Sequence, residues 1–113
     1  MSGYSDGVHV EHAVIHDLQA NGYETTRAAS SKGAADVIAI KAGQVLLVNV
    51  KRTTPPGPSE RKDLLRIAAM LPGVGIAIVA LKPKGCPLRY RQLTGLCFDE
   101  WVSWSPDYVR WSE

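Results

Sequence analysis

The chain has 113 residues, of which 45% are hydrophobic and 21% charged, the size and composition of one ordinary globular domain spanning residues 1–113. No run approaches the roughly 20 apolar residues that span a bilayer, and the first residues lack a signal-peptide core, so we expect a cytoplasmic protein without a membrane segment. Cys86 and Cys97 lie too far apart for a CxxC motif, which argues against a zinc ribbon, and we expect both to be reduced.

The net charge of +2 is distributed unevenly along the chain. Residues 1–26 carry four acids and no Lys or Arg, whereas residues 27–98 carry twelve Lys or Arg residues and three acids. A basic middle between acidic ends indicates a positive surface that faces one direction, which phosphate binding requires. A basic face that is simply well solvated would give the same counts, so charge alone leaves both interpretations open.

The first half of the chain predicts one helix and three strands. Apolar residues at helical spacing predict a helix over residues 8–21, and a short strand follows over residues 23–28. The next two apolar runs, residues 35–40 and 44–50, are rich in Val and Ile and are joined by a short turn that contains glycine. These features predict a β-hairpin.

The second half predicts one helix and two strands. Ser59 can cap a helix over residues 60–71, and the apolar run over residues 74–81 predicts a central strand. Residues 88–93 alternate like an edge strand, and FDEWV at residues 98–102 suggests one helical turn. The order α-β-β-β-α-β-β predicts an α/β fold in which helices flank a mixed β-sheet.

Polar side chains interrupt the apolar pattern at the paired ends of the predicted hairpin. Asp36 opens the first strand, while Asn49 and Lys51 lie two residues apart near the end of the second and so project from one face. An acid, an amide oxygen and an ammonium group at one edge of a sheet could bind a hard cation and polarise water or a phosphate. Glu11 shares a helical stripe with apolar residues, which directs a carboxylate towards the protein body, although a first-turn acid that favours the helix dipole is the alternative.

The same residues lie in a pattern that resembles the core of the PD-(D/E)xK nucleases. The pattern runs from Glu11 through NGYETTRAASSKGAADVIAI to QVLLVNVKR, and it is most similar to the archaeal-type Holliday junction resolvases. The similarity covers roughly residues 8–82, about two-thirds of the chain. It implies a restriction-endonuclease-like fold and a homodimeric endonuclease that resolves four-way DNA junctions by paired symmetric cuts. It also implies Mg²⁺ as the metal, Mn²⁺ as a possible substitute and no small-molecule cofactor.

Residue by residue, the resemblance implies a metal site and a cleavage site. Glu11 and Asp36 match the acidic metal ligands, Ser31 matches a loop serine implicated in cleavage, and Lys51 matches the catalytic lysine. Two positions depart from the family pattern, because Ala35 stands in place of a proline and Asn49 in place of a glutamate. An amide oxygen can ligate Mg²⁺ but brings no charge, so we expect a lower metal affinity. The predicted catalytic set is Glu11, Ser31, Asp36, Asn49 and Lys51, and the predicted metal set is Glu11, Asp36, Asn49 and the backbone carbonyl of Val50.

Basic and hydroxyl side chains near these positions in the sequence are candidates for contacts with the DNA backbone. They are Arg27, Ser30, Lys32, Arg52, Arg61, Lys62 and Arg66. The leading hypothesis is therefore a junction-resolving enzyme that works in the cytoplasm, at the nucleoid or, for a viral protein, in the host cell. Two alternatives remain, namely another nuclease of the superfamily that cuts flaps or duplex DNA, and a non-catalytic DNA-binding relative weakened by Asn49.

Two further groups of side chains admit more than one interpretation. Three histidines occupy one helical face, and two of them have a zinc-like spacing, but no third ligand is evident on a neighbouring motif, which favours exposed histidines. Three tryptophans could stack on bases, although packing on the core or on a second subunit is the interpretation that we favour. These residues are His9, His12, His16, Trp101, Trp104 and Trp111.

Overall fold

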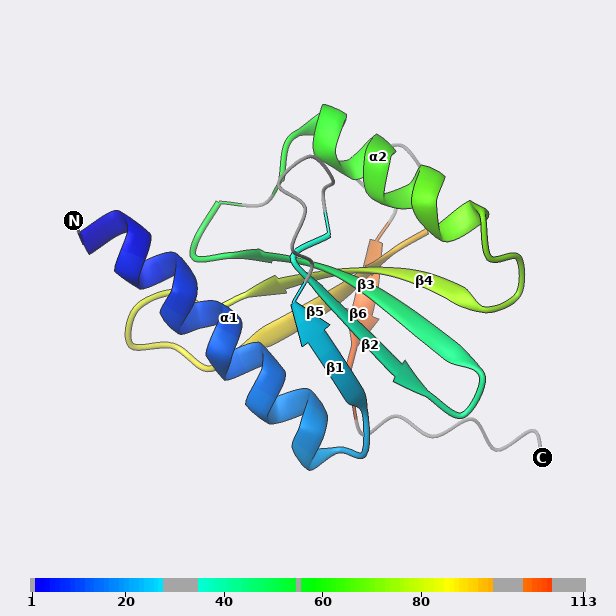
Figure 1. Ribbon diagram of the computed structural model, residues 1–113. Helices are drawn as coiled ribbons and strands as arrows, with labels where there is room; N and C mark the ends of the chain where they lie inside the picture. The colour runs from blue at the N-terminus through cyan, green and yellow to red at the C-terminus, as the bar shows by residue number, and fades with distance from the viewer. Residues whose placement is uncertain (1, 28–34, 55, 95–100, 107–113) are drawn as a thin grey trace.

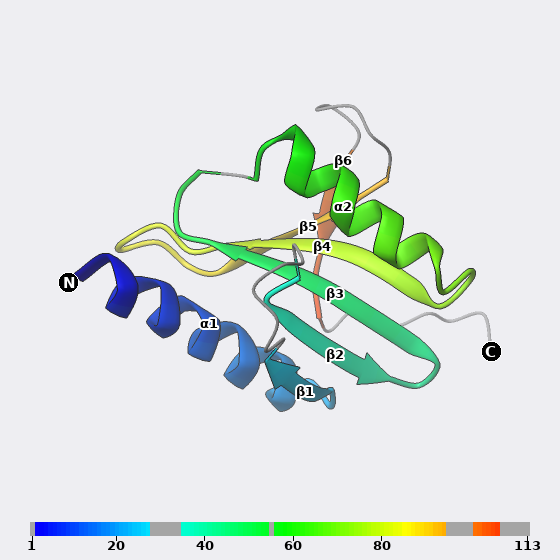
Figure 2. The ribbon, with the colours of Figure 1, turned by 45° about the horizontal axis from the view of Figure 1, so that its top comes forward.

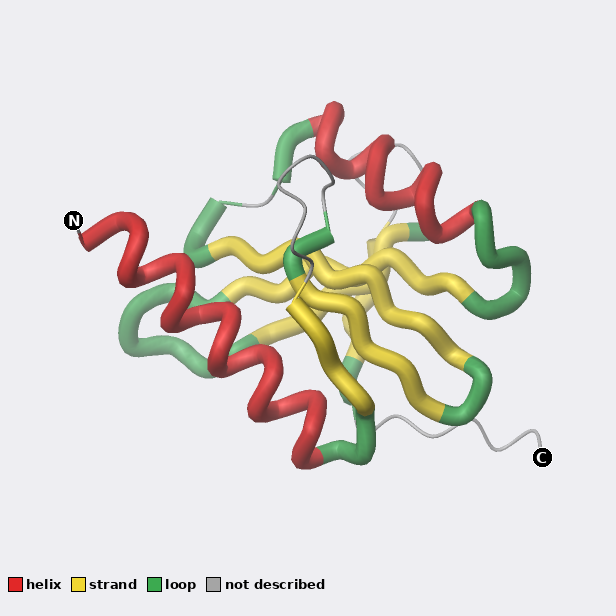
Figure 3. Tube along the Cα trace, viewed as in Figure 1, coloured by secondary structure: helices red, strands yellow, loops and turns green. Residues whose placement is uncertain are grey.

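The computed structural model describes residues 2–27, 35–54, 56–94 and 101–106 (Figure 1). Within these ranges the chain forms α1 (Ser2–Ala20), β1 (Glu24–Arg27), β2 (Val37–Lys41), β3 (Gln44–Lys51), α2 (Pro58–Ala69), β4 (Gly75–Leu81), β5 (Arg89–Leu93) and β6 (Trp101–Trp104). The predicted fold class, a mixed sheet flanked by helices, is confirmed (Figure 3). Neither helix in this part of the chain is long and apolar enough to cross a membrane.

The strands form one sheet in the order β1-β2-β3-β4-β5-β6, which follows the order of the chain. Neighbouring strands are antiparallel except for β3 and β4, which are parallel and are connected through α2. A parallel pair needs such a crossover because the chain must return to the end at which β3 began. The two helices lie on opposite sides of the sheet (Figure 2), so we refer to its α1 face and its α2 face.

Side chains that alternate along the strands fill a separate core on each face of the sheet. The core on the α1 face contains Leu18 of α1 and Val48 of β3. The core on the α2 face contains Leu64 of α2 and Leu47 of β3. The alternation continues to Asn49, which therefore lies on the α2 face.

The register of the β2–β3 hairpin is set by a two-residue turn. Lys41 pairs with Gln44, and the two residues between them, Ala42 and Gly43, both have positive φ angles, 47° and 82°. Positive φ at both central residues is the type I′ geometry, whose twist matches that of the paired strands. A slip of one residue would move every side chain of β2 to the other face, so this turn fixes where Asp36 lies.

α2 begins earlier than predicted and without the predicted cap. Gly57 is the N-cap residue, with extended backbone angles (φ −74°, ψ 178°), and Pro58 opens the helix. Ser59 is exposed inside the first turn, so its prediction as the cap is wrong. Proline suits the first helical position because its ring fixes φ and because that position needs no N–H donor. α1 likewise begins at Ser2, before the predicted start at residue 8.

The C-terminal part of the sheet also differs from the prediction. β6 pairs with β5, with Trp104 opposite Tyr90, so β5 is an inner strand and not the predicted edge strand. Trp101 and Val102 belong to β6, which contradicts the helical turn predicted there, while residues 98–100 lie outside the described ranges. Aromatic and β-branched residues favour a strand, and the pairing satisfies backbone groups that β5 would otherwise expose.

Candidate functional site

Asp36 lies directly beside the end of β3. Its backbone N–H donates a 2.7 Å hydrogen bond to the carbonyl oxygen of Val48, and its Oδ2 accepts a 2.8 Å hydrogen bond from the N–H of Val50. The side chain is therefore tied to the residue between Asn49 and Lys51, both of which lie on the α2 face by strand alternation. The hairpin thus brings these three polar residues to one end of the sheet.

The surroundings of Asp36 disfavour its ionised form. Burial is the main reason that the pKa of the Asp36 carboxyl group lies above its ordinary value, and the carboxylates of Glu11 and Glu60 raise it further. The N–H of Val50 and the ammonium group of Lys51 act in the opposite direction because they stabilise the ionised form. A cation bound beside Asp36 would stabilise that form as well.

The ammonium group of Lys51 is held by an acid that the sequence did not single out. Glu60, in the first turn of α2, places both carboxylate oxygens 3.2 Å from Lys51 Nζ. The two side chains are partly exposed, at 34% for Lys51 and 44% for Glu60. The sequence held one signal, since Glu60 is one of three acids among residues 27–98, but the order of residues does not show that α2 starts beside Lys51.

Glu11 reaches the same end of the sheet from α1. Its Oε1 accepts a 3.0 Å hydrogen bond from Nε of Arg27 and lies 2.9 Å from Nη2 of that residue. Arg27 is the last residue of β1 and pairs with Val37, the chain neighbour of Asp36. Glu11 therefore approaches from the opposite face to Lys51, yet it is close enough for its charge to raise the pKa of the Asp36 carboxyl group.

The donor atoms at this end of the sheet suit a hard cation by chemical type. Carboxylate, amide and carbonyl oxygens are the ligands that Mg²⁺ and Mn²⁺ prefer, and Glu11, Asp36 and Asn49 can supply them. Asn49 is 2% exposed and uncharged, and Val50 can offer only its backbone carbonyl. Among the described residues, no three His, Cys, Asp or Glu side chains come close enough to share one ion. Glu11 and Glu60 are each held by a cationic side chain instead.

Two basic residues of α2 do not present a free charge to DNA. Arg61 is 2% exposed, and its Nη1 donates a 2.8 Å hydrogen bond to the carbonyl oxygen of Pro56. A buried guanidinium group cannot meet a phosphate, so Arg61 is a structural residue and not the predicted DNA contact. Arg66 donates hydrogen bonds of 2.6 Å and 3.1 Å to Asp63, which offsets its charge.

The other residues predicted to contact DNA differ in their exposure and in their ion pairing. Lys62 is exposed on α2, Arg52 is half-buried directly after β3, and Arg27 is bound to Glu11. The predicted loop residues Ser30, Ser31 and Lys32 lie outside the described ranges.

Arg89 and Arg91 of β5 are exposed basic residues that the sequence did not point to. Strand pairing through β4 places Arg89 in the same row of the sheet as Lys51, and Arg91 in the same row as Asn49. Each arginine is two strands away from its row partner, which is about 10 Å at the usual strand spacing. Only the register of three strands reveals this proximity, because 38 residues separate Lys51 from Arg89 and 42 separate Asn49 from Arg91.

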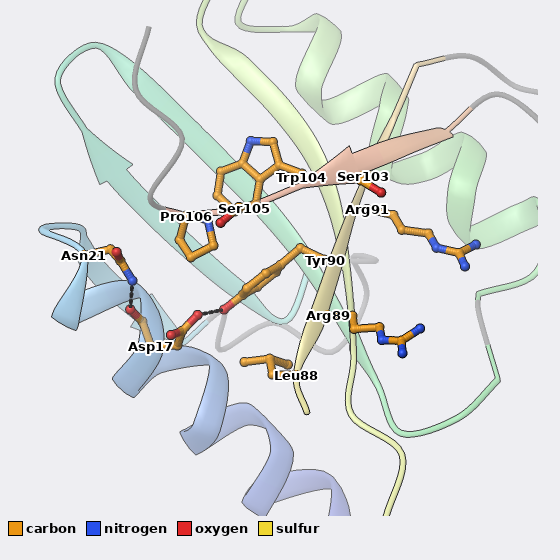
Figure 4. Close-up of a pocket in the computed structure, with 10 residues that line it drawn as sticks. All are labelled: Asp17, Asn21, Leu88, Arg89, Tyr90, Arg91, Ser103, Trp104, Ser105 and Pro106. Atoms are coloured by element: carbon orange, nitrogen blue, oxygen red, sulfur yellow. Dashed lines mark hydrogen bonds between the residues drawn. The ribbon is translucent and has the colours of Figure 1, made fainter. Parts of the chain in front are cut away.

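Figure 4 shows which way these arginines point. A pocket of about 460 Å³ lies on the α1 face, where Tyr90 donates a 2.7 Å hydrogen bond to Oδ2 of Asp17. Burial, reinforced by this bond, raises the pKa of Tyr90. Arg89 and Arg91 extend away from Tyr90, as alternation along β5 requires, so they lie on the α2 face with Lys51.

Where the structure describes them, the histidines are exposed and the tryptophan packs on the core, as the favoured interpretations predicted. His12 and His16 are exposed, and Trp104 packs edge-on against Tyr90 of the core with ring centroids 5.4 Å apart. Cys86 carries a free thiol. The side chains of His9, Trp101, Trp111 and Cys97 lie outside the described part of the chain.

Comparisons with known proteins agree on one family. The family model for archaeal Holliday junction resolvases (Hjc) matches residues 2–90. Among solved structures, Hjc from Archaeoglobus fulgidus, a Holliday junction resolvase from an archaeal hyperthermophile, shares the fold with a TM-score of 0.63. That match has 22% sequence identity and covers 80% of this chain and 79% of the other. A search of curated proteins gives no match. The family match spans most of the chain and confirms the resemblance read from the sequence, so the protein belongs to the archaeal Holliday junction resolvase family.

Proposed function

We propose that this protein is a metal-dependent endonuclease that resolves four-way DNA junctions by paired, symmetric phosphodiester cuts. The observation that carries the proposal is the position of Asp36, whose carboxylate is bonded to the backbone between Asn49 and Lys51. An acid and a lysine held at one end of a sheet can position a phosphate and the water that attacks it. Membership of the resolvase family supports branched DNA as the substrate.

Each proposed site residue has a role that follows from its chemistry. Asp36 and Glu11 would hold Mg²⁺, or Mn²⁺ in its place, with neutral oxygens from Asn49 and the carbonyl of Val50. When bound, the ion supplies Lewis acidity and lowers the pKa of a water molecule. Lys51 orients the attacking water or stabilises the negative charge that develops on the phosphate.

The DNA backbone is proposed to cross the end of the sheet where β3 ends and β5 begins. Positive side chains at this end would bind phosphates through charge and hydrogen bonds, independently of sequence. From the described residues we propose Arg27, Arg52, Lys62, Arg89 and Arg91 for this surface. On the resemblance alone we also propose Ser30, Ser31 and Lys32, which lie outside the described ranges. Ser31 is proposed to take part in cleavage, on the resemblance alone.

We propose that two copies of the chain act together on DNA in the cytoplasm. Resolving a four-way junction requires two cuts related by symmetry, and the described residues contain one Asp36–Lys51 site. A twofold symmetric dimer supplies two identical sites in a fixed relative orientation. The symmetry of the cuts would then follow from the symmetry of the protein.

One observation favours a second candidate function, a junction-binding protein without nuclease activity. Asn49 stands where the resemblance implies a glutamate, and it is buried and uncharged. The carboxylates of Glu11 and Glu60 are paired with Arg27 and Lys51. A protein in which these pairs persist in the presence of Mg²⁺ would hold DNA without cutting it.

A cleavage assay on junction, flap and linear duplex DNA separates these functions. With Mg²⁺ or Mn²⁺ we expect paired cuts confined to the junction, and without metal we expect binding alone. Equal cutting of flaps or duplex would assign the protein to another substrate class. Binding to the junction without cutting in either metal would contradict the enzymatic proposal and support the second candidate.

A further inference from the structure

Two ion pairs lie at the Asp36 end of the sheet, and each contains a cation that we propose to bind DNA. Nζ of Lys51 lies 3.2 Å from each carboxylate oxygen of Glu60. Arg27 directs Nε and Nη2 at Oε1 of Glu11, at 3.0 Å and 2.9 Å. The acids belong to different helices, Glu60 to α2 and Glu11 to α1, and so approach from opposite faces of the sheet. Together they neutralise two cations of the proposed DNA surface in the free protein.

The donor groups in these pairs are the ones that a phosphate would use. A guanidinium group binds a carboxylate or a phosphate through the same planar edge of N–H donors, and an ammonium group binds either one as a point charge. Glu11 already occupies the Nε–Nη2 edge of Arg27. A phosphate that binds this edge must therefore replace Glu11. The single positive charge of Lys51 is offset by Glu60 in the same way.

Solvent reaches both ion pairs, so an incoming phosphate can reach them as well. The exposed fractions of the side chains are 34% for Lys51, 44% for Glu60, 52% for Arg27 and 21% for Glu11. An exposed ion pair contributes little to stability, so separating its partners costs the folded protein little. The cations can therefore exchange a carboxylate for a phosphate without a change of fold.

We propose that two acids, Glu60 and Glu11, compete with DNA for the cations that they bind. In the free protein each carboxylate occupies a phosphate-binding position, and in the complex a phosphate oxygen of the junction replaces it. A substrate must then supply enough further contacts to displace both acids, which disfavours DNA that reaches only one of them. This inference rests on the proposed function, because it takes Lys51 and Arg27 as contacts to DNA phosphates.

An ordinary role for these acids predicts a different behaviour. A surface carboxylate that does not compete with DNA still repels it through its charge. Removing such an acid would raise DNA affinity whether or not the paired cation is present. Removing a competitor raises the affinity through that cation, so the gain disappears when the cation is removed as well. The dependence on the paired cation therefore separates competition from simple repulsion.

Binding of the full chain to a labelled four-way junction, measured by fluorescence anisotropy without divalent metal, tests the proposal. Glu60→Gln should tighten binding by roughly two- to fivefold, which is the energy of an exposed ion pair expressed as an affinity. The same substitution in a Lys51→Met background should leave the affinity nearly unchanged, because the cation for which Glu60 competes is absent. Non-additivity of this kind measures the interaction between the two residues.

The second ion pair repeats the test independently. Glu11→Gln should also tighten binding, and this gain should disappear in an Arg27→Met background. Glu24→Gln is the matched control, since it makes the same change in net charge at the opposite end of β1 from Arg27 and should have a smaller effect.

A loss of folding would not imitate the expected result, because an unfolded variant would lose the site whereas a gain in affinity is expected. Thermal unfolding of each variant shows whether the fold is retained. Glu60→Ala should give the same gain as Glu60→Gln through a different side chain.

The possible failures of this experiment are distinguishable. Equal gains from Glu60→Gln in the wild-type and Lys51→Met backgrounds, or a gain no larger than that of Glu24→Gln, would overturn the competition. The junction would still be bound in that case, so the proposed function would stand. A wild-type protein that does not bind the junction would contradict the proposed function and, with it, this inference.

Discussion

The carboxylate of Asp36 and the backbone N–H of Val50 are joined by a 2.8 Å hydrogen bond across the β2–β3 hairpin. Val50 stands between Asn49 and Lys51, so this bond fixes the acid relative to the lysine through the backbone of the sheet. Burial and two neighbouring carboxylates meanwhile disfavour the ionised form of Asp36 and raise its pKa. The ionised carboxylate of Asp36 therefore lowers the stability of the folded protein, but it places a charged group at a defined position. Such a combination is common at functional sites.

The raised pKa of Asp36 predicts that Asp36→Asn stabilises the protein at neutral pH. The folded protein binds the proton of this carboxyl group more tightly than the unfolded chain does. The stability that the group contributes is therefore present below the ordinary aspartate pKa of about 4 and is lost as the pH rises through the raised folded-state pKa. An asparagine at this position stays neutral and can still accept the hydrogen bond from Val50.

Thermal unfolding of the wild type and Asp36→Asn across the pH range tests this prediction. The Tm of Asp36→Asn should exceed that of the wild type at neutral pH, and the difference should shrink as the acid limit is approached. A difference that does not change with pH would mean that ionisation of Asp36 is not its cause.

Replacing Arg89 or Arg91 by glutamine should weaken junction binding while leaving the fold intact, because both side chains are exposed. Each phosphate contact that is lost should reduce the slope of log K against log salt by about 0.9. Fluorescence anisotropy with a labelled junction measures both quantities. Arg66→Gln is the matched control, since Asp63 already offsets the charge of Arg66. Equal losses in the control would show that net charge, and not position, explains the effect.

Arg61→Met should destabilise the protein without changing the salt dependence of DNA binding. The guanidinium group is buried and donates to the carbonyl oxygen of Pro56, and a hydrogen bond from a charged donor is worth about 1.5–3 kcal/mol. Urea unfolding should therefore show a lower free energy of unfolding. Unchanged stability of Arg61→Met, together with a smaller slope of log K against log salt, would show that Arg61 contacts DNA.

The sequence predicted the hairpin and its polar end because the determinants are local. Apolar runs and a glycine-containing turn define β2 and β3, and alternation along β3 then places Asn49 and Lys51 on one face. The exposure of His12 and His16 and the packing of Trp104 were also predicted correctly. The hairpin and the face on which Asn49 and Lys51 lie depend on residues close together in the chain.

The features that the sequence missed depend on tertiary structure. Glu60 meets Lys51 only because α2 starts beside the end of β3, and Arg91 shares a row with Asn49 only through the register of β4. Arg61 was taken for a surface residue because arginine is mostly exposed, and nothing in its neighbours signals burial. β6 was missed because its pairing partner, the free edge of β5, is a property of the assembled sheet.

Cleavage of a four-way junction by the wild type and by Asp36→Asn, with cut positions mapped on all four strands, tests the central claim most directly. In Mg²⁺ the wild type should make two cuts at symmetric positions, whereas Asp36→Asn should bind the same junction with similar affinity and leave it intact. Undiminished cutting by Asp36→Asn would contradict the assignment of the site to the Asp36 end of the hairpin.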